Sequence, residues 1–112
     1  MFNSIQEVES PELARWVEDE SHSLRVIDVR EMPEIFQGTM PRAEPLPLAT
    51  LPLRLNDFDF EEKLVIICRS GARSAQACMF LQQQGFKNVY NLRGGMISWA
   101  HNSLPIVRPE VA

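Results

Sequence analysis

The stretch LVIICRSGARS, residues 64–74, determines the fold expected for this chain. Its first part, Leu64 to Cys68, is a run of five apolar residues, which is typical of a strand buried on both faces of a sheet. A turn containing Gly71 follows at once. A helix is then expected over Ser74 to Gln84, because apolar residues recur there at helical spacing and Gly85 can end it in a C-terminal cap.

Other strands and helices are expected to alternate along the chain on either side of this unit. Ser10, followed by Pro11, is typical of a helix start, because a serine side chain can cap exposed amides and proline fits the first turn. The further elements expected are a strand over Leu24 to Val29, a short helix over Pro33 to Gln37, a strand over Val89 to Leu92 and a helix after Gly94-Gly95. This order predicts an α/β fold with a mostly parallel sheet covered on both faces.

The segment from Pro41 to Pro52 is punctuated by four prolines. Proline lacks the backbone donor that a helix interior or a central strand needs. We therefore expect an extended connection there, with at most a brief strand at a sheet edge.

Length and composition indicate a single domain. The chain has 112 residues, of which 45% are hydrophobic, enough for a core without a disulfide lattice or a structural metal. We expect one domain over 1–112, with its core over about residues 5–102 and a C-terminal tail over 103–112.

The charge pattern and the hydropathy exclude several classes of protein. With 15 acidic and 11 basic residues the formal charge is −4, and the basic residues are scattered, so nucleic acid is not an expected partner. The longest run without a charged residue, 94–107, is too short and too polar to cross a membrane. The first ten residues do not resemble a secretory signal, so we expect a cytoplasmic protein.

The two cysteines are expected to be thiols in a reducing compartment. Their number leaves one disulfide open, but Cys68 and Cys78 fall on adjoining elements and are expected to point apart. Cys78 lies at core spacing within the expected helix, which favours packing over a role as a resolving thiol. The Cys and His residues have no zinc-ligand spacing, so we expect neither a metal nor another cofactor.

Residues 68–74 carry the chemistry expected for the chain. Ligands of α/β sheets gather beyond the carboxyl ends of the strands, which is where Cys68 lies. Lowering the pKa of a cysteine from about 8.5 to about 7 requires roughly 2 kcal/mol, and a helix N-terminus typically supplies about 0.3–1 kcal/mol. We therefore expect the loop amides and Arg73 to supply the rest, making Cys68 a thiolate nucleophile. The loop contains no His, so a Cys–His dyad is not indicated.

Residues 68–74, CRSGARS, resemble the active-site loop of the rhodanese-type sulfurtransferases. The resemblance continues in VIDVRE, residues 26–31, and in NVYNLRGGMISW, residues 88–99, and it covers about residues 5–99. It implies a three-layer α/β/α rhodanese fold with a central sheet of about five strands. It also implies that Cys68 accepts sulfane sulfur from thiosulfate or a persulfide donor and passes it, as a persulfide, to cyanide or a thiol. The partners so implied are these small molecules and, as an option, a donor or acceptor protein.

The length of the loop separates this interpretation from a phosphatase or an arsenate reductase. Four residues lie between Cys68 and Arg73, one fewer than in the related tyrosine-type phosphatases. The shorter loop favours a bound sulfur atom over a tetrahedral oxyanion.

The chain departs from the family's pattern at one segment. Where the family generally has Gly-His-Ile-Pro-Gly-Ala, residues 38–43 read GTMPRA, so the imidazole and the second glycine are replaced by Thr39 and Arg42. We expect local structural change here more than lost chemistry. The altered segment and the prolines also motivate an alternative, a module for protein interaction or sulfur relay without significant turnover.

The expected site residues have different roles. Ser70 and Ser74 are expected to donate to sulfur or, for Ser74 equally, to cap the helix; Asp28 and Arg30 are expected to form an ion pair that supports the loop from the neighbouring strand. The full set expected is Cys68 as nucleophile, Arg69, Ser70, Gly71, Ala72, Arg73 and Ser74 as the loop that binds substrate and stabilises the persulfide, and Asp28 and Arg30 in support.

Overall fold

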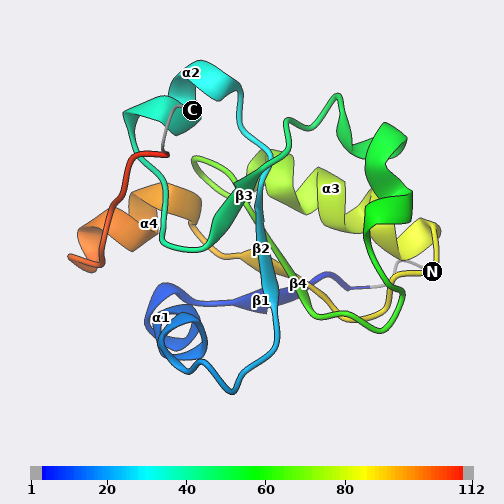
Figure 1. The fold of residues 1–112 in the computed structure, drawn as a ribbon, viewed down its shortest axis with the longest axis horizontal. Helices are drawn as coiled ribbons and strands as arrows, with labels where there is room; N and C mark the ends of the chain where they lie inside the picture. Colours follow the sequence, from blue (N-terminus) through cyan, green and yellow to red (C-terminus); the bar gives the residue numbers. More distant parts are fainter. Residues whose placement is uncertain (1–3, 110–112) are drawn as a thin grey trace.

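The computed structural model describes residues 4–109 of the chain (Figure 1). Its strands are β1 (Gln6–Val8), β2 (Arg25–Asp28), β3 (Ala43–Pro45), β4 (Leu64–Ile67) and β5 (Val89–Leu92). Its α-helices are α1 (Ser10–Glu18), α2 (Met32–Gln37), α3 (Ala72–Gln83) and α4 (Gly95–His101), and a 3-10 helix, η1, spans Leu51–Asp57.

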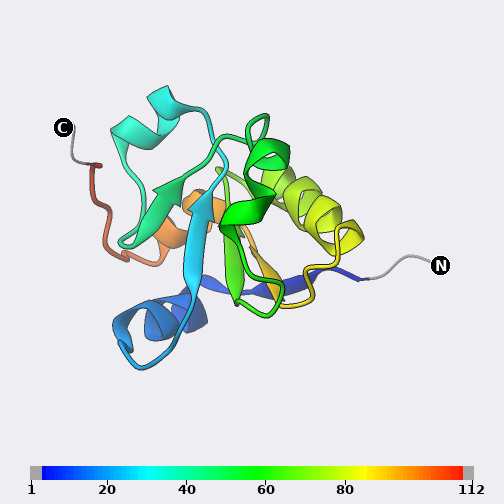
Figure 2. The ribbon, with the colours of Figure 1, turned by 45° about the vertical axis from the view of Figure 1, so that its right-hand side comes forward.

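The five strands form one parallel sheet in the order β1-β5-β4-β2-β3 (Figure 2). β4 is central, with β2 and β5 on either side, and β3 lies at an edge as the proline-rich sequence predicts. Because all strands run the same way, the carboxyl ends of β2, β4 and β5 meet at one edge of the sheet. The expected α/β architecture is confirmed.

The sheet separates two layers of core. Along β4 the side chains alternate: Val65 and Ile67 face α1 and α4, where Leu13 and Trp99 are buried. Ile66 and Cys68 face α3 and the segment that carries η1. Figure 1 shows α1 and α4 to one side of the sheet and α3 to the other. Every residue of β4 is buried, as its continuous apolar sequence predicts.

Several local features differ from the sequence-based expectation. Ser10 does not cap α1: Glu9 occupies that position, and the buried Ser10 hydroxyl lies 3.2 Å from Ser98 Oγ of α4. Strand β1 and the helix η1 are not predicted by the sequence pattern. Gly85 does follow α3 in a left-handed conformation, and the amides of Gly85 and Phe86 bond back to the last turn, so the predicted C-terminal cap is confirmed.

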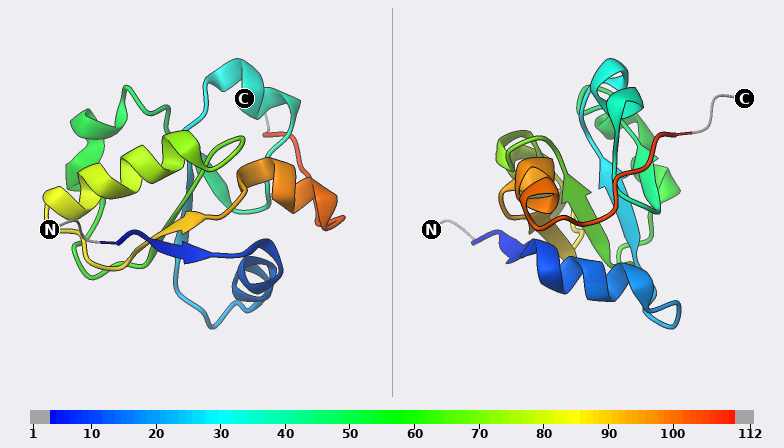
Figure 3. Two further views of the ribbon diagram at one scale, coloured as in Figure 1. Left: turned by 180° about the vertical axis from the view of Figure 1, so that it is seen from behind. Right: turned by 90° about the vertical axis from the view of Figure 1, so that its left-hand side faces the viewer.

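The segment after α4 packs against the rest of the domain. Trp99 Nε1 donates to the Pro105 carbonyl at 2.7 Å, and Val107 pairs with Thr39 through two backbone hydrogen bonds of 2.7 Å. Figure 3 shows this segment running from α4 towards α2. It therefore forms part of the wall beside the carboxyl edge of the sheet.

Among the helices of residues 4–109, none combines the length and the apolar character needed to span a membrane.

Candidate active site

Cys68 is the first residue after β4, at the carboxyl edge of the sheet. Its side chain is buried, and the chain turns through residues 69–71 directly into α3, which begins at Ala72 rather than at Ser74. The sulfur thus lies beneath the N-terminal turn of a twelve-residue helix. We refer to residues 68–74 as the Cys68 loop.

Gly71 gives the Cys68 loop its turn. It caps α3 in a left-handed conformation, with φ of +101°, which an L side chain adopts only at a cost. In this conformation the Gly71 amide donates to Cys68 Sγ at 3.1 Å. The glycine of the predicted turn therefore delivers a donor to the sulfur.

Several donors act together on the Cys68 thiol. Burial by itself raises the pKa of Cys68, but the Ser74 hydroxyl, 3.3 Å from Sγ, and the amides of Ser74, Gly71 and Ser70 lower it. The net result is a pKa below the ordinary value for cysteine. Since each of these groups prefers an anionic acceptor, the arrangement favours the thiolate.

Ser74 lies inside α3 and does not cap it. Of the two roles left open by the sequence, the structure therefore supports hydrogen bonding to sulfur. The buried Ser74 hydroxyl also lies within hydrogen-bonding distance of the Asn91 side chain of β5, a residue that sequence analysis did not identify.

The N-terminus of α4 holds the other side of the Cys68 loop. The Met96 amide donates to the Cys68 carbonyl at 2.9 Å, and the Ile97 amide donates to the Arg69 carbonyl at 3.0 Å. A Cβ on Gly95 would lie 2.5 Å from the Arg69 carbonyl oxygen and 2.6 Å from that of Cys68. The contact between α4 and the loop therefore requires glycine at this position.

The guanidinium of Arg73 takes a different position from the one expected over the sulfur. It forms two hydrogen bonds with the Glu34 carboxylate of α2, of 2.8 and 2.9 Å. This bond to Arg73 is the main reason why the pKa of Glu34 falls to about 2. The Glu34 interaction likewise raises the pKa of Arg73, and the negative charge of Cys68 adds to it, so Arg73 acts on the sulfur through its field.

Asp28 and Arg30 form the ion pair that the sequence predicts. Arg30 binds the buried Asp28 carboxylate through Nη2 at 2.7 Å and Nε at 3.0 Å, and also donates to the Gly38 carbonyl at 2.7 Å. Thr39, at the position where the family has histidine, donates its hydroxyl to Asp28 at 2.8 Å. The substituted segment is thus tied to β2 by this buried network.

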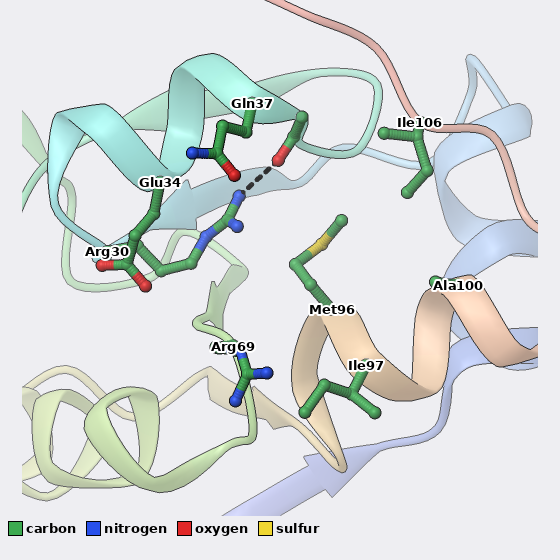
Figure 4. A pocket seen from close by; sticks show the side chains of 9 residues that line it. Arg30, Glu34, Gln37, Arg69, Met96, Ile97, Ala100 and Ile106 are labelled. Carbon is green, nitrogen blue, oxygen red and sulfur yellow. Dashed lines mark hydrogen bonds between the residues drawn. The ribbon is translucent and has the colours of Figure 1, made fainter.

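A cavity of about 390 Å³ opens between α2, α4 and the Cys68 loop (Figure 4). Arg69 lies on one side of it, opposite Glu34 and Gln37 of α2, and Met96 points into it from α4. The exposed Arg69 side chain thus lies where the cavity adjoins the Cys68 loop. The lining residues are Arg30, Glu34, Gln37, Gly38, Arg69, Met96, Ile97, Ala100 and Ile106.

Several residues of this site are not predicted by the sequence pattern. Glu34, Asn91 and Met96 come from three different elements, and their positions depend on tertiary contacts. No short-range pattern marks them. Ala72 and Ser70, which the resemblance includes in the loop, have exposed side chains, and Ser70 acts on Cys68 through its backbone amide.

The second cysteine, Cys78, lies in an environment that disfavours its thiolate form. Cys78 lies on α3 with its side chain buried in the core and, like Cys68, is a free thiol. Burial raises the pKa of Cys78 to about 12, which is consistent with the packing role favoured by the sequence. Among residues 4–109, no three His, Cys, Asp or Glu side chains gather as a metal site.

Known proteins resemble this chain over most of its length. A sulfurtransferase of Allochromatium vinosum is 45% identical over 106 residues, covering 95% of this chain and 98% of the relative. A rhodanese-like domain protein from Staphylococcus aureus has a TM-score of 0.79 at 33% identity, over 85% of this chain and 91% of the other. A rhodanese-related protein from Thermoplasma volcanium has a TM-score of 0.81 at 28% identity, over 91% and 97% of the two chains. With residues 10–102 matching the rhodanese-like domain family, this chain belongs to that family.

Proposed function

We propose that this protein is a sulfurtransferase in which Cys68 carries sulfane sulfur as a persulfide. The observation that carries the proposal is the set of donors directed at Cys68 Sγ, above all the Gly71 amide and the Ser74 hydroxyl. These donors stabilise an anionic sulfur without a cofactor. Sulfur transfer in general is also supported by the relative of Allochromatium vinosum, which is named a sulfurtransferase.

The first half-reaction loads the cysteine. The Cys68 thiolate attacks the outer sulfur of thiosulfate or of a donor persulfide, and a new sulfur–sulfur bond forms. The donor's own bond to that sulfur breaks, and its electron pair leaves with sulfite or with the donor thiolate. The negative charge moves to the terminal sulfur of the Cys68 persulfide.

The second half-reaction returns the cysteine to its thiolate form. A nucleophile such as cyanide or a thiolate attacks the terminal sulfur, and the bond to Cys68 Sγ breaks with its electron pair remaining on Sγ. Neither half-reaction requires an external oxidant or reductant. A reducing compartment such as the cytoplasm would supply the thiol acceptor, and we propose that location for the reaction.

The cavity beside the Cys68 loop supports an anionic donor. Arg69 is exposed at its edge. The other arginine of the lining, Arg30, is paired with Asp28, whereas Arg69 forms no ion pair within residues 4–109. We therefore propose that Arg69 guides thiosulfate or the anionic end of a persulfide donor towards the loop.

Mass spectrometry after thiosulfate treatment tests the proposal. The unaltered protein and a Cys78→Ser variant should both gain one sulfur atom, which is lost on adding cyanide. A Cys68→Ser variant should gain none. The proposal fails if Cys68→Ser acquires the same transferable sulfur, or if the unaltered protein acquires none from thiosulfate or from a persulfide donor.

Release of the sulfur distinguishes turnover from relay. The enzyme should transfer sulfur repeatedly to cyanide or small thiols. Loading that is followed by no release to any small acceptor would contradict the turnover reaction and favour the relay module, whose acceptor is a protein.

A further inference from the structure

Asn91 lies on β5 and links the Cys68 loop to the edge strand β1. Its side-chain nitrogen donates to the Gly71 carbonyl at 3.2 Å and to the Glu7 carboxylate of β1 at 3.1 Å. Both partners can only accept, so the amide is fixed with its NH₂ group towards them. The carbonyl oxygen of Asn91 therefore faces the Ser74 hydroxyl.

The Ser74 hydroxyl thus has two acceptors and a single proton. One acceptor is Asn91 Oδ1, and the other is Cys68 Sγ at 3.3 Å. Because Ser74 and Cys68 are buried and Asn91 is only 3% exposed, bulk water does not replace the bond that is given up.

The charge on Cys68 decides which acceptor receives the proton. When Cys68 is a thiol, its own S–H can donate to Ser74 Oγ, and the hydroxyl then donates to Asn91. When Cys68 is a thiolate, the hydroxyl must turn to sulfur, and the bond to Asn91 is lost. In a persulfide the inner sulfur carries no charge, so the hydroxyl is free to return.

We propose that Asn91 is a positioning residue of this site. Its carbonyl oxygen competes with Cys68 Sγ for the Ser74 proton. The Ser74 hydroxyl therefore turns towards sulfur when Sγ is charged and towards Asn91 when it is not. The part of this proposal that concerns the persulfide rests on the proposed function. The part that concerns the change from thiol to thiolate does not. Asn91 thus opposes formation of the thiolate. Once Sγ has bonded to the transferred sulfur, the Ser74 hydroxyl again donates to Asn91.

Other charged or titratable groups lie around this network and must be kept constant in a test. Arg73 and Cys78 interact with its charge from α3, Asp28 lies on β2 within its pair with Arg30, and Glu7 reaches Asn91 from β1. Of these, only Glu7 touches Asn91. Glu7→Gln, which removes the charge but can keep an acceptor for the amide, is therefore the matched control.

A double-mutant cycle on the Cys68 pKa tests the proposal. The pKa is read from the ultraviolet absorbance of the thiolate, in a Cys78→Ala background and without any sulfur donor. Asn91→Leu should lower the pKa by about one unit, the scale of one lost competing hydrogen bond. Ser74→Ala should raise it, and adding Asn91→Leu to Ser74→Ala should then change nothing.

Other results of the cycle overturn the proposal. It fails if Asn91→Leu raises the pKa or leaves it unchanged, if its effect is the same with and without the Ser74 hydroxyl, or if Glu7→Gln reproduces the effect. Asn91→Ala removes the same acceptor with less bulk and serves if the leucine variant does not fold.

A measurement on the unaltered protein needs no variant of Asn91. The ¹³C shift of the Asn91 side-chain carbonyl should report loss of its hydrogen bond as Cys68 ionises, and recovery of that bond after sulfur loading. An unchanged shift through the ionisation contradicts the competition. Failure to load sulfur, by contrast, would contradict the proposed function while leaving the titration result intact.

Discussion

Arg73 and Glu34 are joined by two hydrogen bonds that bridge α3 and α2 beside the cavity. Glu34 is also the N3 residue of α2, and its carboxylate accepts the Glu31 amide at 3.0 Å, so the acidic partner of the pair is anchored to its own helix. The arginine of the loop is therefore held by a fixed partner. Its charge is partly neutralised before any substrate arrives.

Glu34→Gln should increase the reactivity of the site towards an anionic donor. Removing the carboxylate leaves the Arg73 charge uncompensated, so we expect kcat/KM for thiosulfate to rise about two- to fivefold at low salt and to approach that of the unaltered protein as salt screens the charge. Asp57→Asn, which breaks the exposed Arg54–Asp57 pair, is the matched control and should have no effect. An unchanged or lower rate for Glu34→Gln would contradict this role of the pair.

The same carboxylate should make stability depend on acid pH. Arg73 holds the folded-state pKa of Glu34 at about 2, below its ordinary 4.5. The stabilisation is therefore complete above about pH 4.5 and is lost as the pH falls towards 2. Both side chains are about one third exposed, so we expect less than about 1 kcal/mol. Urea unfolding at pH 6 and pH 3 should show a smaller loss of stability for Glu34→Gln than for the unaltered protein; equal losses would refute the linkage.

Gly71→Ala should impair both the fold and the thiol. A side chain at φ of +101° costs about 1–2 kcal/mol in unfolding free energy, and relief of that strain would move the amide away from Cys68 Sγ. We expect the Cys68 pKa to rise, measured from the pH dependence of iodoacetamide modification. Ala72→Gly, one residue further on, should leave the Cys68 pKa unchanged. A Gly71→Ala protein with an unshifted pKa would show that the Gly71 amide is dispensable.

Thr39→Val should destabilise the protein by about 1–2 kcal/mol, because it removes the hydroxyl that donates to the buried Asp28 carboxylate. Thr39→Ser keeps the donor and should lose less. Denaturant unfolding of the two variants measures the difference. If the valine variant is as stable as the serine variant, the hydroxyl does not support the Asp28–Arg30 pair.

Arg42 occupies a left-handed conformation, with φ of +70°, at the position where the family generally has glycine. Its guanidinium donates to the carbonyls of Val17 and Leu24, which offsets part of the backbone strain. Arg42→Ala keeps the strain and loses the bonds, so it should cost about 1–2 kcal/mol. Arg42→Gly relieves the strain and should cost less in the same unfolding measurement; the reverse order would contradict this balance.

The elements predicted from the sequence are those that local patterns specify. The apolar run of β4, the glycine turn at Gly71 and the Schellman cap at Gly85 each depend on a few consecutive residues. Strand β1 was missed because Gln6–Val8 has one buried side chain and acquires its conformation by pairing with β5. Ser10 has the sequence of a cap, yet its hydroxyl is taken by a contact between helices.

The candidate site likewise contains residues that local sequence predicts and residues that it does not. Cys68, the loop around it and the Asp28–Arg30 pair follow from the position of residues at strand ends. The partners that decide how the loop works, Glu34 for Arg73 and Asn91 for Ser74, lie 39 and 17 positions away in sequence. Only the folded arrangement of α2 and β5 brings them together.

The hydrogen bonds from α4 to the Cys68 loop determine the direction of the loop's peptide dipoles. A peptide group points its carbonyl and the following N–H to opposite sides, so the bonds from Met96 and Ile97 to the carbonyls of Cys68 and Arg69 turn the next amides away from α4. The electrostatic environment of the sulfur is then preorganised when the chain folds, and little reorganisation is needed at the moment of reaction. A side chain at Gly95 would push α4 away from the carbonyls of Cys68 and Arg69, and would thereby reorient the dipoles around the sulfur without touching it.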